Sequence, residues 1–509
     1  MPSRWSDRFA WALALAVTGA GAWLRWRGVT SLDLQGDELT YVGASFSDAL
    51  GLEGLLFYAP LRPLLTFLAL AVDPGVVALR ALGWLPGVVV PLAFFALFRP
   101  VAGPWPALAA AACLAFDEGQ AWTSVVGLVY ALVILLQIVA LAAHRRVVAG
   151  REPAGALPWA VASALLLLAH YLMLPFVLLT AVTGTLAVRA AGSPELSRAW
   201  RRALVGVGAV ALPVGALLAF GLTRRFLLAA SAGLPGMQAV AVGDLLGLNL
   251  VPFGVFRPPV NVVVAAVALA GGLLAVRRAA APLAHWLGFL VVLVAAIPFV
   301  PRIQAMQLFF LHVPLLALLL EAAAPLAERG PGVRLPLSAA ALGVTGLAAV
   351  VGLGLGPFAG TGWITGNQPP YAPLHELAAT LAARPDLPPA VVLHPPGQMA
   401  ALALARRPAL DLEPCTDRVD DGGVQQEIAC PEGTVVAAWP TDDRRRIAWP
   451  EPPAGPWLAA VEKVKVWNLE GRWPESPAWS APDVPPAALG LPASCRPVAA
   501  LQWLLYRCP

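Results

Sequence analysis

Long apolar runs separated by short polar loops fill the first 357 residues of the chain. Most of these runs approach the ~20 residues that a helix needs to cross a bilayer. We therefore predict a mainly α, polytopic membrane domain over residues 1–357, with about eleven transmembrane helices. The predicted spans are residues 9–24, 76–98, 104–116, 125–143, 157–169, 171–188, 203–222, 259–276, 283–300, 305–324 and 335–356.

One further apolar stretch, residues 61–72, is short and contains Arg62 and Pro63. Such a length fits an interfacial or re-entrant helix better than a membrane span. We assign this stretch to one long external loop, residues 25–75, which carries short helices at the membrane surface.

The composition agrees with a membrane location. Of the 509 residues, 59% are hydrophobic and only 13% are charged, and the mean hydropathy is +0.72. Soluble domains carry roughly 25% charged residues, so these values exclude an ordinary soluble enzyme. The net charge of +4 is too small and too scattered for nucleic-acid binding, which needs clustered basic faces.

The residues after position 357 differ in composition and predict a separate soluble domain, residues 358–509. This part holds 24 of the 50 prolines and no apolar stretch near the ~20 residues of a span. Two β-rich runs, residues 390–393 and 434–439, predict buried strands, and residues 397–406 can form a helix between them. We expect a small α/β domain.

Four of the five cysteines lie in this tail, whereas Cys113 lies alone in an apolar helix and is expected to be buried. The spacing suits two local disulfides, Cys415–Cys430 and Cys495–Cys508. Disulfides persist in oxidising compartments, which places the tail outside the cytoplasm. A zinc site is the weaker alternative, because no Cys-x-x-Cys pair occurs and the nearest histidines are far off in sequence.

The arginines predict the topology. With the N-terminus in the cytoplasm and a crossing at each span, the inside loops carry most of the basic residues, which is the positive-inside pattern of a bacterial inner-membrane protein. Eleven crossings also leave the tail outside, in agreement with the cysteines. The inside loops contain Arg4, Arg8, Arg99, Arg145, Arg146, Arg151, Arg189, Arg198, Arg201, Arg202, Arg277, Arg278, Arg329 and Arg334.

Two adjacent acid pairs lie in the first two external loops, Asp37-Glu38 and Asp117-Glu118. A carboxylate at the bilayer edge can accept a proton from a substrate hydroxyl or hold a divalent metal. Asp37, Asp117 and Glu118 are therefore also the candidate ligands of a possible divalent metal. The alternative is that all four are ordinary loop acids that face water.

Arginines at the outer face are contrary to the positive-inside bias, so a negatively charged group should compensate their charge. Guanidinium groups pair bidentately with phosphate, which suits a lipid-linked phosphate; the alternative is that they extend toward headgroups. The outer arginines are Arg62, Arg80, Arg224, Arg225, Arg257 and Arg302.

Two histidines are further candidates. His170, beside Tyr171 in a turn at the same face, is expected to line the substrate pocket. His312 lies inside a predicted span and is expected to be a neutral histidine bonded to a carbonyl.

Three motifs resemble the amino-terminal module of GT-C glycosyltransferases, above all the dolichyl-phosphate-mannose–protein mannosyltransferase-like (glycosyltransferase family 39) and aminoarabinose-transferase-like types. The motifs are Gly36-Asp37-Glu38-x-x-Tyr41, Pro60-Leu61-Arg62-Pro63-Leu64 and Ala78-Leu79-Arg80-Ala81-Leu82-Gly83. The resemblance continues to Asp117-Glu118, His170-Tyr171 and Arg302 and covers roughly residues 10–325. It implies that Asp37 is the catalytic base, with Glu38, Asp117 and Glu118 in support, and that Tyr41 belongs to the substrate-binding residues.

These features predict an inverting glycosyltransferase that moves a sugar from a polyprenyl-phosphate donor to a hydroxyl of a lipid, glycan or protein. The reaction takes place on the outer face of the membrane and needs no nucleotide, in keeping with the lack of a Walker or G-x-G-x-x-G motif. The alternative from another class is a transporter or lipid flippase, since Gly- and Pro-rich helices can serve alternating access. A further alternative is a catalytically inactive relative.

Overall fold

The protein forms two compact units in the computed structural model. The first consists of Met1–Thr30, Ala44–Val72 and Val77–Asn367, and the second of Ser31–Gly43, Asp73–Val76 and Gln368–Pro509. The structure describes residues 4–31, 50–51, 55, 59–72, 76–125, 129–231, 310–327 and 331–355, and in the tail 391–393, 416–419, 425–430, 433–438, 456–462, 486–489, 491–500 and 503–509.

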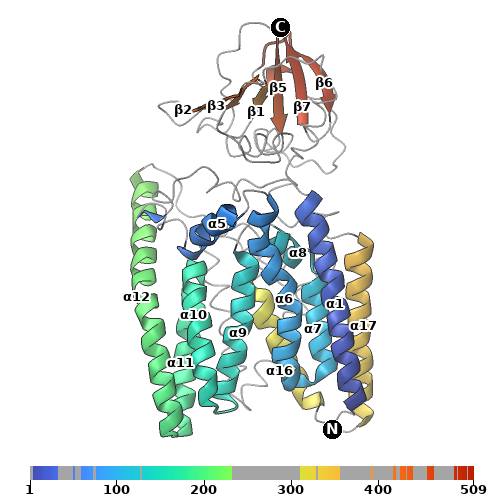
Figure 1. The fold of residues 1–509 in the computed structure, drawn as a ribbon, viewed down its shortest axis with the longest axis vertical. Helices are drawn as coiled ribbons and strands as arrows, with labels where there is room; N and C mark the ends of the chain where they lie inside the picture. Colours follow the sequence, from blue (N-terminus) through green and yellow to red (C-terminus); the bar gives the residue numbers. More distant parts are fainter. Residues whose placement is uncertain are drawn as a thin grey trace. The chain divides into compact units, whose positions relative to one another are not determined.

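The first unit is helical, as the apolar pattern predicts (Figure 1). Helices lie at each predicted span that falls within the described residues, whereas spans 259–276 and 283–300 lie outside them, so the count of eleven stays a prediction. The elements are α1 (Arg4–Ser31), α5 (Leu61–Val72), α6 (Val76–Ala102), α7 (Pro104–Phe116), α8 (Glu118–Val125), α9 (Tyr130–Val148), η1 (Pro153–Gly155), α10 (Ala156–Ala169), η2 (Tyr171–Met173), α11 (Leu174–Ala191), α12 (Pro194–Ser231), α16 (His312–Ala327) and α17 (Pro331–Leu355).

Four of the described helices are long and apolar enough to cross a membrane: Val77–Ala102, Tyr130–Val148, Tyr171–Ala191 and Pro194–Phe220. Shorter apolar helices cover Pro104–Phe116, Pro153–Ala169, His312–Leu326 and Leu335–Val350. The prediction of a mainly α membrane protein is therefore confirmed. The stretch 61–72 is a helix, α5, and its place at the membrane surface remains a prediction.

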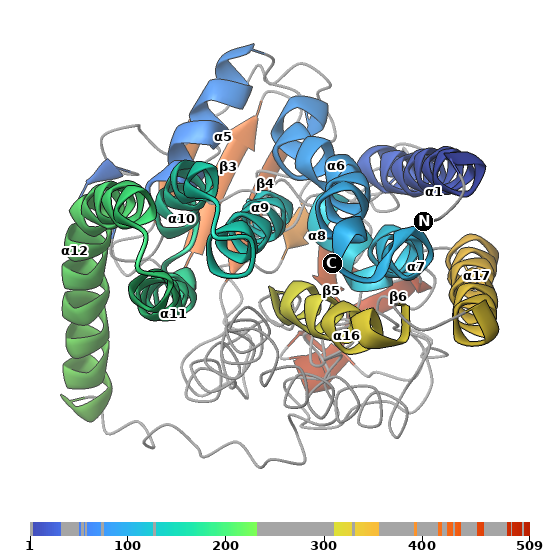
Figure 2. The same cartoon turned by 90° about the horizontal axis from the view of Figure 1, so that it is seen from below.

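Small side chains bring α1 and α7 close together. Ala10 and Ala14 of α1 are buried in one cluster with Ala107 and Ala111 of α7, and small residues let helix backbones approach closely in membranes. A tight turn joins α6 to α7 at Gly103, whose φ of 90° is open to glycine and strained for other residues. Figure 2 shows α17 beside α7 on the same side of the unit.

A second group of helices, α9 to α12, packs around a larger apolar core. Trp159 of α10 and Trp200 of α12 lie with their ring centroids 4.3 Å apart, and each indole N–H donates to a threonine hydroxyl of α11. The ring of Trp200 fills the space beside Gly184 of α11, where an added Cβ would lie 2.2 Å from it. The packing of α11 against α12 therefore requires glycine at position 184.

Ion pairs gather at the end of the helices that the arginine pattern assigns to the cytoplasm. Arg99, in the last turn of α6, bonds Asp7, in the first turn of α1, at 2.7 Å. Arg145, at the end of α9, bonds Glu321 of α16 at 2.9 Å. Asp7, Arg99 and Arg145 lie at helix ends that the predicted topology places on one side of the membrane, whereas Glu321 lies within α16.

The tail contains a seven-stranded mixed sheet in the order β2-β3-β4-β1-β5-β7-β6. Strand β1 lies parallel to β4 and β5, and the other neighbours are antiparallel. The two predicted strands are confirmed as β1 and β4, while the predicted helix 397–406 lies outside the described residues. The elements are β1 (Val391–Leu393), β2 (Thr416–Val419), β3 (Gln425–Cys430), β4 (Gly433–Ala438), β5 (Trp457–Glu462), η6 (Pro486–Leu489), β6 (Arg496–Ala500) and β7 (Trp503–Cys508).

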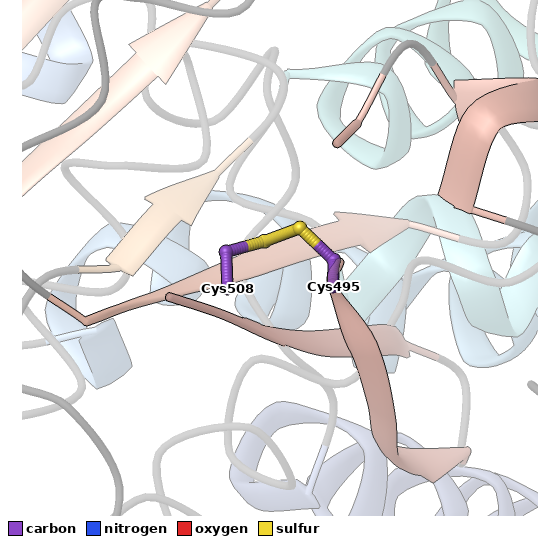
Figure 3. Close-up of a disulfide and its surroundings, with 2 residues drawn as sticks. All are labelled: Cys495 and Cys508. Atoms are coloured by element: carbon purple, nitrogen blue, oxygen red, sulfur yellow. A yellow bond between two sulfur atoms is a disulfide. The ribbon is translucent and has the colours of Figure 1, made fainter. Parts of the chain in front are cut away.

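A disulfide joins Cys495 to Cys508, as the spacing predicts (Figure 3). It ties the residue before β6 to the end of β7, and both cysteines are buried. Cys415 lies outside the described residues, so the second predicted bridge stays a prediction. Thr416 and Ala429, the sequence neighbours of Cys415 and Cys430, are register partners in β2 and β3.

Candidate active site at the turn between α7 and α8

Asp117 occupies the turn between α7 and α8. Its extended backbone, with φ −65° and ψ 130°, ends the helical run, and its N–H donates to the carbonyl of Cys113. One carboxylate oxygen, Oδ2, accepts the backbone N–H of Gln120 at 2.9 Å, as an aspartate at a helix N-cap does. The residue is only 4% exposed, so the carboxylate is held in one place.

Arg25 of α1 holds the other side of this turn. The side chain is fully buried and donates to the carbonyls of Ala115 at 2.7 Å and Leu114 at 2.9 Å. These are carbonyls of the last turn of α7, where a cation is favourable because it opposes the helix dipole. The charge of Asp117 also acts on the guanidinium. The sequence reasoning missed Arg25, although an arginine within an apolar helix is a signal of a buried polar role.

His312, the first residue of α16, lies beside the same turn. Its Nδ1 is 3.0 Å from Nε2 of Gln120 and 3.8 Å from Oδ2 of Asp117. An amide nitrogen donates and does not accept, so Nδ1 is the acceptor and the neutral ring carries its proton on Nε2. Nδ1 of His312 is thus paired with the amide of Gln120, and the expected bond of the ring to a carbonyl stays a prediction.

His170 lies in a second polar group, in the turn between α10 and η2. Its Nδ1 accepts the N–H of Leu172 at 3.3 Å, which leaves the proton on Nε2. Burial, and to a smaller extent the positive charge of Arg62, lower the pKa of His170 from 6.5 to about 4. The ring packs edge-on against Phe310, two residues before His312, with centroids 5.2 Å apart. This contact brings the second group next to the start of α16.

The other predicted residues of the outer face have specific partners. Arg62 of α5 is 6% exposed and close enough to His170 for its charge to act there. The hydroxyl of Tyr171 donates to the carbonyl of Leu55 at 2.6 Å. Arg80 of α6 donates to the carbonyl of Val29, in the last turns of α1, at 2.9 Å. Arg62, His170 and Tyr171 are thus brought to one region, whereas the guanidinium of Arg80 contacts the end of α1.

Several predicted site residues fall outside these contacts. Asp37, Glu38, Tyr41, Arg257 and Arg302 lie outside the described residues, and for Glu118, Arg224 and Arg225 only the helical backbone of α8 and α12 is described. Among the residues that the structure describes, no three His, Cys, Asp or Glu side chains gather as metal ligands. Asp117 alone of the three metal candidates has a described side chain.

The chain matches no protein-family model and no curated protein sequence. Among solved structures, it is similar to ArnT from Cupriavidus metallidurans bound to undecaprenyl phosphate, with a TM-score of 0.50 and 13% identity over 100% of this chain and 98% of that one. This chain has the fold of ArnT. The apo structure of the same ArnT matches with a TM-score of 0.47 and 12% identity over 97% of both chains. The overall fold expected from the sequence motifs is confirmed by the likeness to ArnT bound to undecaprenyl phosphate.

Proposed function

We propose that this GT-C protein is an inverting glycosyltransferase. It moves a sugar from a polyprenyl-phosphate donor to a hydroxyl of a lipid, glycan or protein at the outer face of a bacterial inner membrane. The observation that carries the proposal is the full-length likeness to ArnT bound to undecaprenyl phosphate. The buried acid of the α7–α8 turn and the Arg62–His170 group support it, because both lie next to residues 310–312 at the start of α16.

The donor phosphate is assigned to the cationic side of this region. Arg62 supplies a guanidinium, which binds phosphate bidentately, and neutral His170 supplies an Nε2–H donor that burial keeps uncharged at neutral pH. We assign Arg224, Arg225 and Arg302 to the same phosphate. A neutral donor adds no positive charge to the site. His170 can therefore hydrogen-bond the phosphate without binding the polyprenyl-phosphate product too tightly for release.

In the proposed reaction, Asp37 takes the proton from the acceptor hydroxyl as that oxygen attacks the anomeric carbon. The bond from the anomeric carbon to the phosphate oxygen breaks, and the electron pair leaves with the polyprenyl phosphate. One displacement inverts the configuration at this carbon. Glu38, Asp117 and Glu118 support the base by shaping the local charge, and no step requires a metal, although a divalent ion bound by these acids would polarise the phosphate.

The experiment uses the purified full chain in lipid nanodiscs, with undecaprenyl-phosphate sugars as donors and an extract of bacterial membrane lipids as acceptor. The expected result is release of undecaprenyl phosphate together with a glycosylated product, measured by mass spectrometry. The matched control is Asp37→Asn, which keeps the shape of the side chain and removes the base. Movement of the donor across the bilayer without sugar transfer would contradict the proposal and favour a flippase.

A further inference from the structure

We infer that the inner ends of α11 and α12 form a binding surface for anionic phospholipids. The inner end of a helix is the one that the arginine pattern assigns to the cytoplasm. The inference goes beyond the proposed function and does not depend on sugar transfer. The surface consists of five arginines, here called the α11–α12 arginine cluster: Arg151, Arg189, Arg198, Arg201 and Arg202.

The turn between α11 and α12 brings these arginines together. Gly192 makes this turn with a φ of 66°, a left-handed conformation that favours glycine after a helix. Arg189, in the last turn of α11, and Arg198, in the second turn of α12, lie on either side of it. The short helix η1 begins two residues after Arg151 and packs against α12. The five arginines therefore lie around one end of this helix pair.

No acid in the described part of the chain pairs with the cluster. All five arginines are exposed, and none of them forms an ion pair with a described residue. The Nε atom of Arg198 donates to the carbonyl of Pro194 at 3.3 Å. By contrast, three arginines near the same ends of the helices bond acids of the protein, in the pairs Arg99–Asp7, Arg145–Glu321 and Arg146–Glu152.

Such a concentration of like charge is unfavourable for the protein alone. Arg198 and Arg202 are four residues apart on α12, a spacing at which like charges repel. The one acid between positions 189 and 220 is Glu195, which is exposed and forms no ion pair within the described residues. An anion from outside the protein would therefore stabilise this surface.

The cluster lies at the depth of lipid headgroups. Arg202 and Arg224 both belong to α12 and are 22 positions apart, which is about 33 Å along a helix. This length is close to the ~30 Å thickness of the hydrocarbon layer. Because arginine is costly within the hydrocarbon, α12 fits the membrane with Arg202 in one headgroup layer and Arg224 near the other.

Exposed apolar side chains continue from the cluster toward the middle of the membrane. On α12, Val205 and Leu212 follow Arg202 on the same helix face and are 70% and 77% exposed. On α11, Leu186 lies three residues before Arg189 and is 61% exposed. Each helix thus presents guanidinium groups at the headgroup level and an apolar face next to them.

A diacyl phospholipid with a net negative headgroup matches this order of groups. Its phosphate accepts the guanidinium groups bidentately, and its acyl chains cover the apolar faces. Basic surfaces at the cytoplasmic ends of membrane helices attract anionic headgroups in this way. Free phosphate would match the arginines but not the apolar faces, so we assign the surface to the lipid.

The test is native mass spectrometry of the full-length protein in neutral detergent, which gives the apparent Kd for phosphatidylglycerol and, for comparison, for zwitterionic phosphatidylcholine. Wild-type protein should bind phosphatidylglycerol more tightly. Arg202→Gln should weaken that binding about fivefold, which corresponds to about 1 kcal/mol for one basic residue near a membrane surface. Its Kd for phosphatidylcholine should not change.

Arg8→Gln is the matched control. Arg8 is also exposed and lies near the same ends of the helices, but it belongs to α1, which packs in the other apolar cluster. Figures 1 and 2 show α1 and α12 on opposite sides of the helical unit, so screening by salt separates Arg8 from the arginine cluster. The Kd for phosphatidylglycerol should therefore stay at the wild-type value in Arg8→Gln. Melting temperatures without lipid should be equal in the two variants, because both side chains are exposed.

Equal losses of affinity in Arg202→Gln and Arg8→Gln, or equal wild-type affinities for the two lipids, would overturn the inference. Displacement of phosphatidylglycerol by inorganic phosphate would reveal a site for a free anion and would overturn it as well. Tighter binding of undecaprenyl phosphate than of phosphatidylglycerol, with the same sensitivity to Arg202→Gln, would assign the surface to the donor lipid instead. None of these measurements uses sugar transfer, so a failure of the proposed function leaves the inference standing.

Discussion

The Nη1 atom of Arg25 lies 2.7 Å from the backbone oxygen of Ala115, which joins the first helix of the chain to the last turn before Asp117. The guanidinium also bonds Gly21 and Leu114, so one side chain serves carbonyls of two helices. A buried arginine is expensive unless its N–H groups are satisfied; both Nη atoms of Arg25 have carbonyl partners, and its buried Nε has none. Here the cation replaces the hydrogen bonds that the end of α7 cannot make within its own helix.

Arg25→Leu is expected to destabilise the helical unit by about 2–4 kcal/mol, because it leaves the carbonyls of Leu114 and Ala115 buried without donors. The measurement is thermal unfolding of the purified protein in detergent. Arg27→Leu is the matched control, since Arg27 lies two residues away, is exposed and stacks over Trp23. Its effect should stay within about 0.5 kcal/mol; equal losses in the two variants would contradict the role of Arg25.

Gly184→Ala should destabilise the α9–α12 group by about 1–3 kcal/mol, because the new methyl group meets the ring of Trp200 in a packed core. Gly208→Ala in α12 is the control, since nothing lies within 4 Å of its Cβ position. Thermal unfolding of both variants in the same detergent measures the difference. A wild-type melting temperature for Gly184→Ala would show that Trp200 can move aside.

Oxidised protein should contain two bridges, Cys495–Cys508 and Cys415–Cys430, with Cys113 free. Loops of this length stabilise the tail by about 3 kcal/mol each on the chain-entropy model. Peptide mapping without reductant checks the pairing, and a reporter fused at residue 400 checks that the tail is extracytoplasmic. Free thiols in the tail, or a reporter that is active only in the cytoplasm, would contradict this topology.

Asp37→Asn should lower the transfer rate by about 10²–10⁴-fold, the usual contribution of a positioned general base. Folding should be unaffected, with a change within about 0.5 kcal/mol. Glu38→Gln is the control, because it removes a neighbouring carboxylate that supports the base without accepting the proton, and it should retain much more activity. Turnover at the wild-type rate by Asp37→Asn would rule out this residue as the base.

The stability of the protein should fall as the pH drops from about 6.5 toward 4, in part because of His170. Burial and then the charge of Arg62 lower the pKa of His170 to about 4 from its ordinary value of 6.5. Between these values the unfolded chain binds a proton that the folded protein does not, so acid favours unfolding. In His170→Gln, the difference between the melting temperatures at pH 7 and pH 5 should be smaller than in wild type. An unchanged difference would mean that His170 is not buried as a neutral ring.

The sequence predicts helices and strands better than it predicts the side-chain contacts between them. Apolar length alone locates α6, α7 and α10, and β-rich runs locate β1 and β4, because burial on a local segment leaves a local pattern. The contact of Arg25 with Ala115 and that of Gln120 with His312 depend on which helices pack together. No periodicity records that choice, so the sequence predicts neither the role of Arg25 nor the contact of His312 with Gln120. The position of Asp117 was predicted from its loop, but its role as the cap of α8 needed the geometry.

The central place of β1 in the tail sheet has a consequence for the order in which the protein is made. Val391 pairs with Val435 of β4 and with Leu458 of β5. Both partner strands are synthesised after β1, so β1 cannot pair until they emerge. Such non-local pairing folds slowly compared with helices. A nascent chain released before residue 457 would expose one edge of β1, and an open strand edge is a template for aggregation. Cells that produce this protein should therefore protect the emerging tail until β5 arrives.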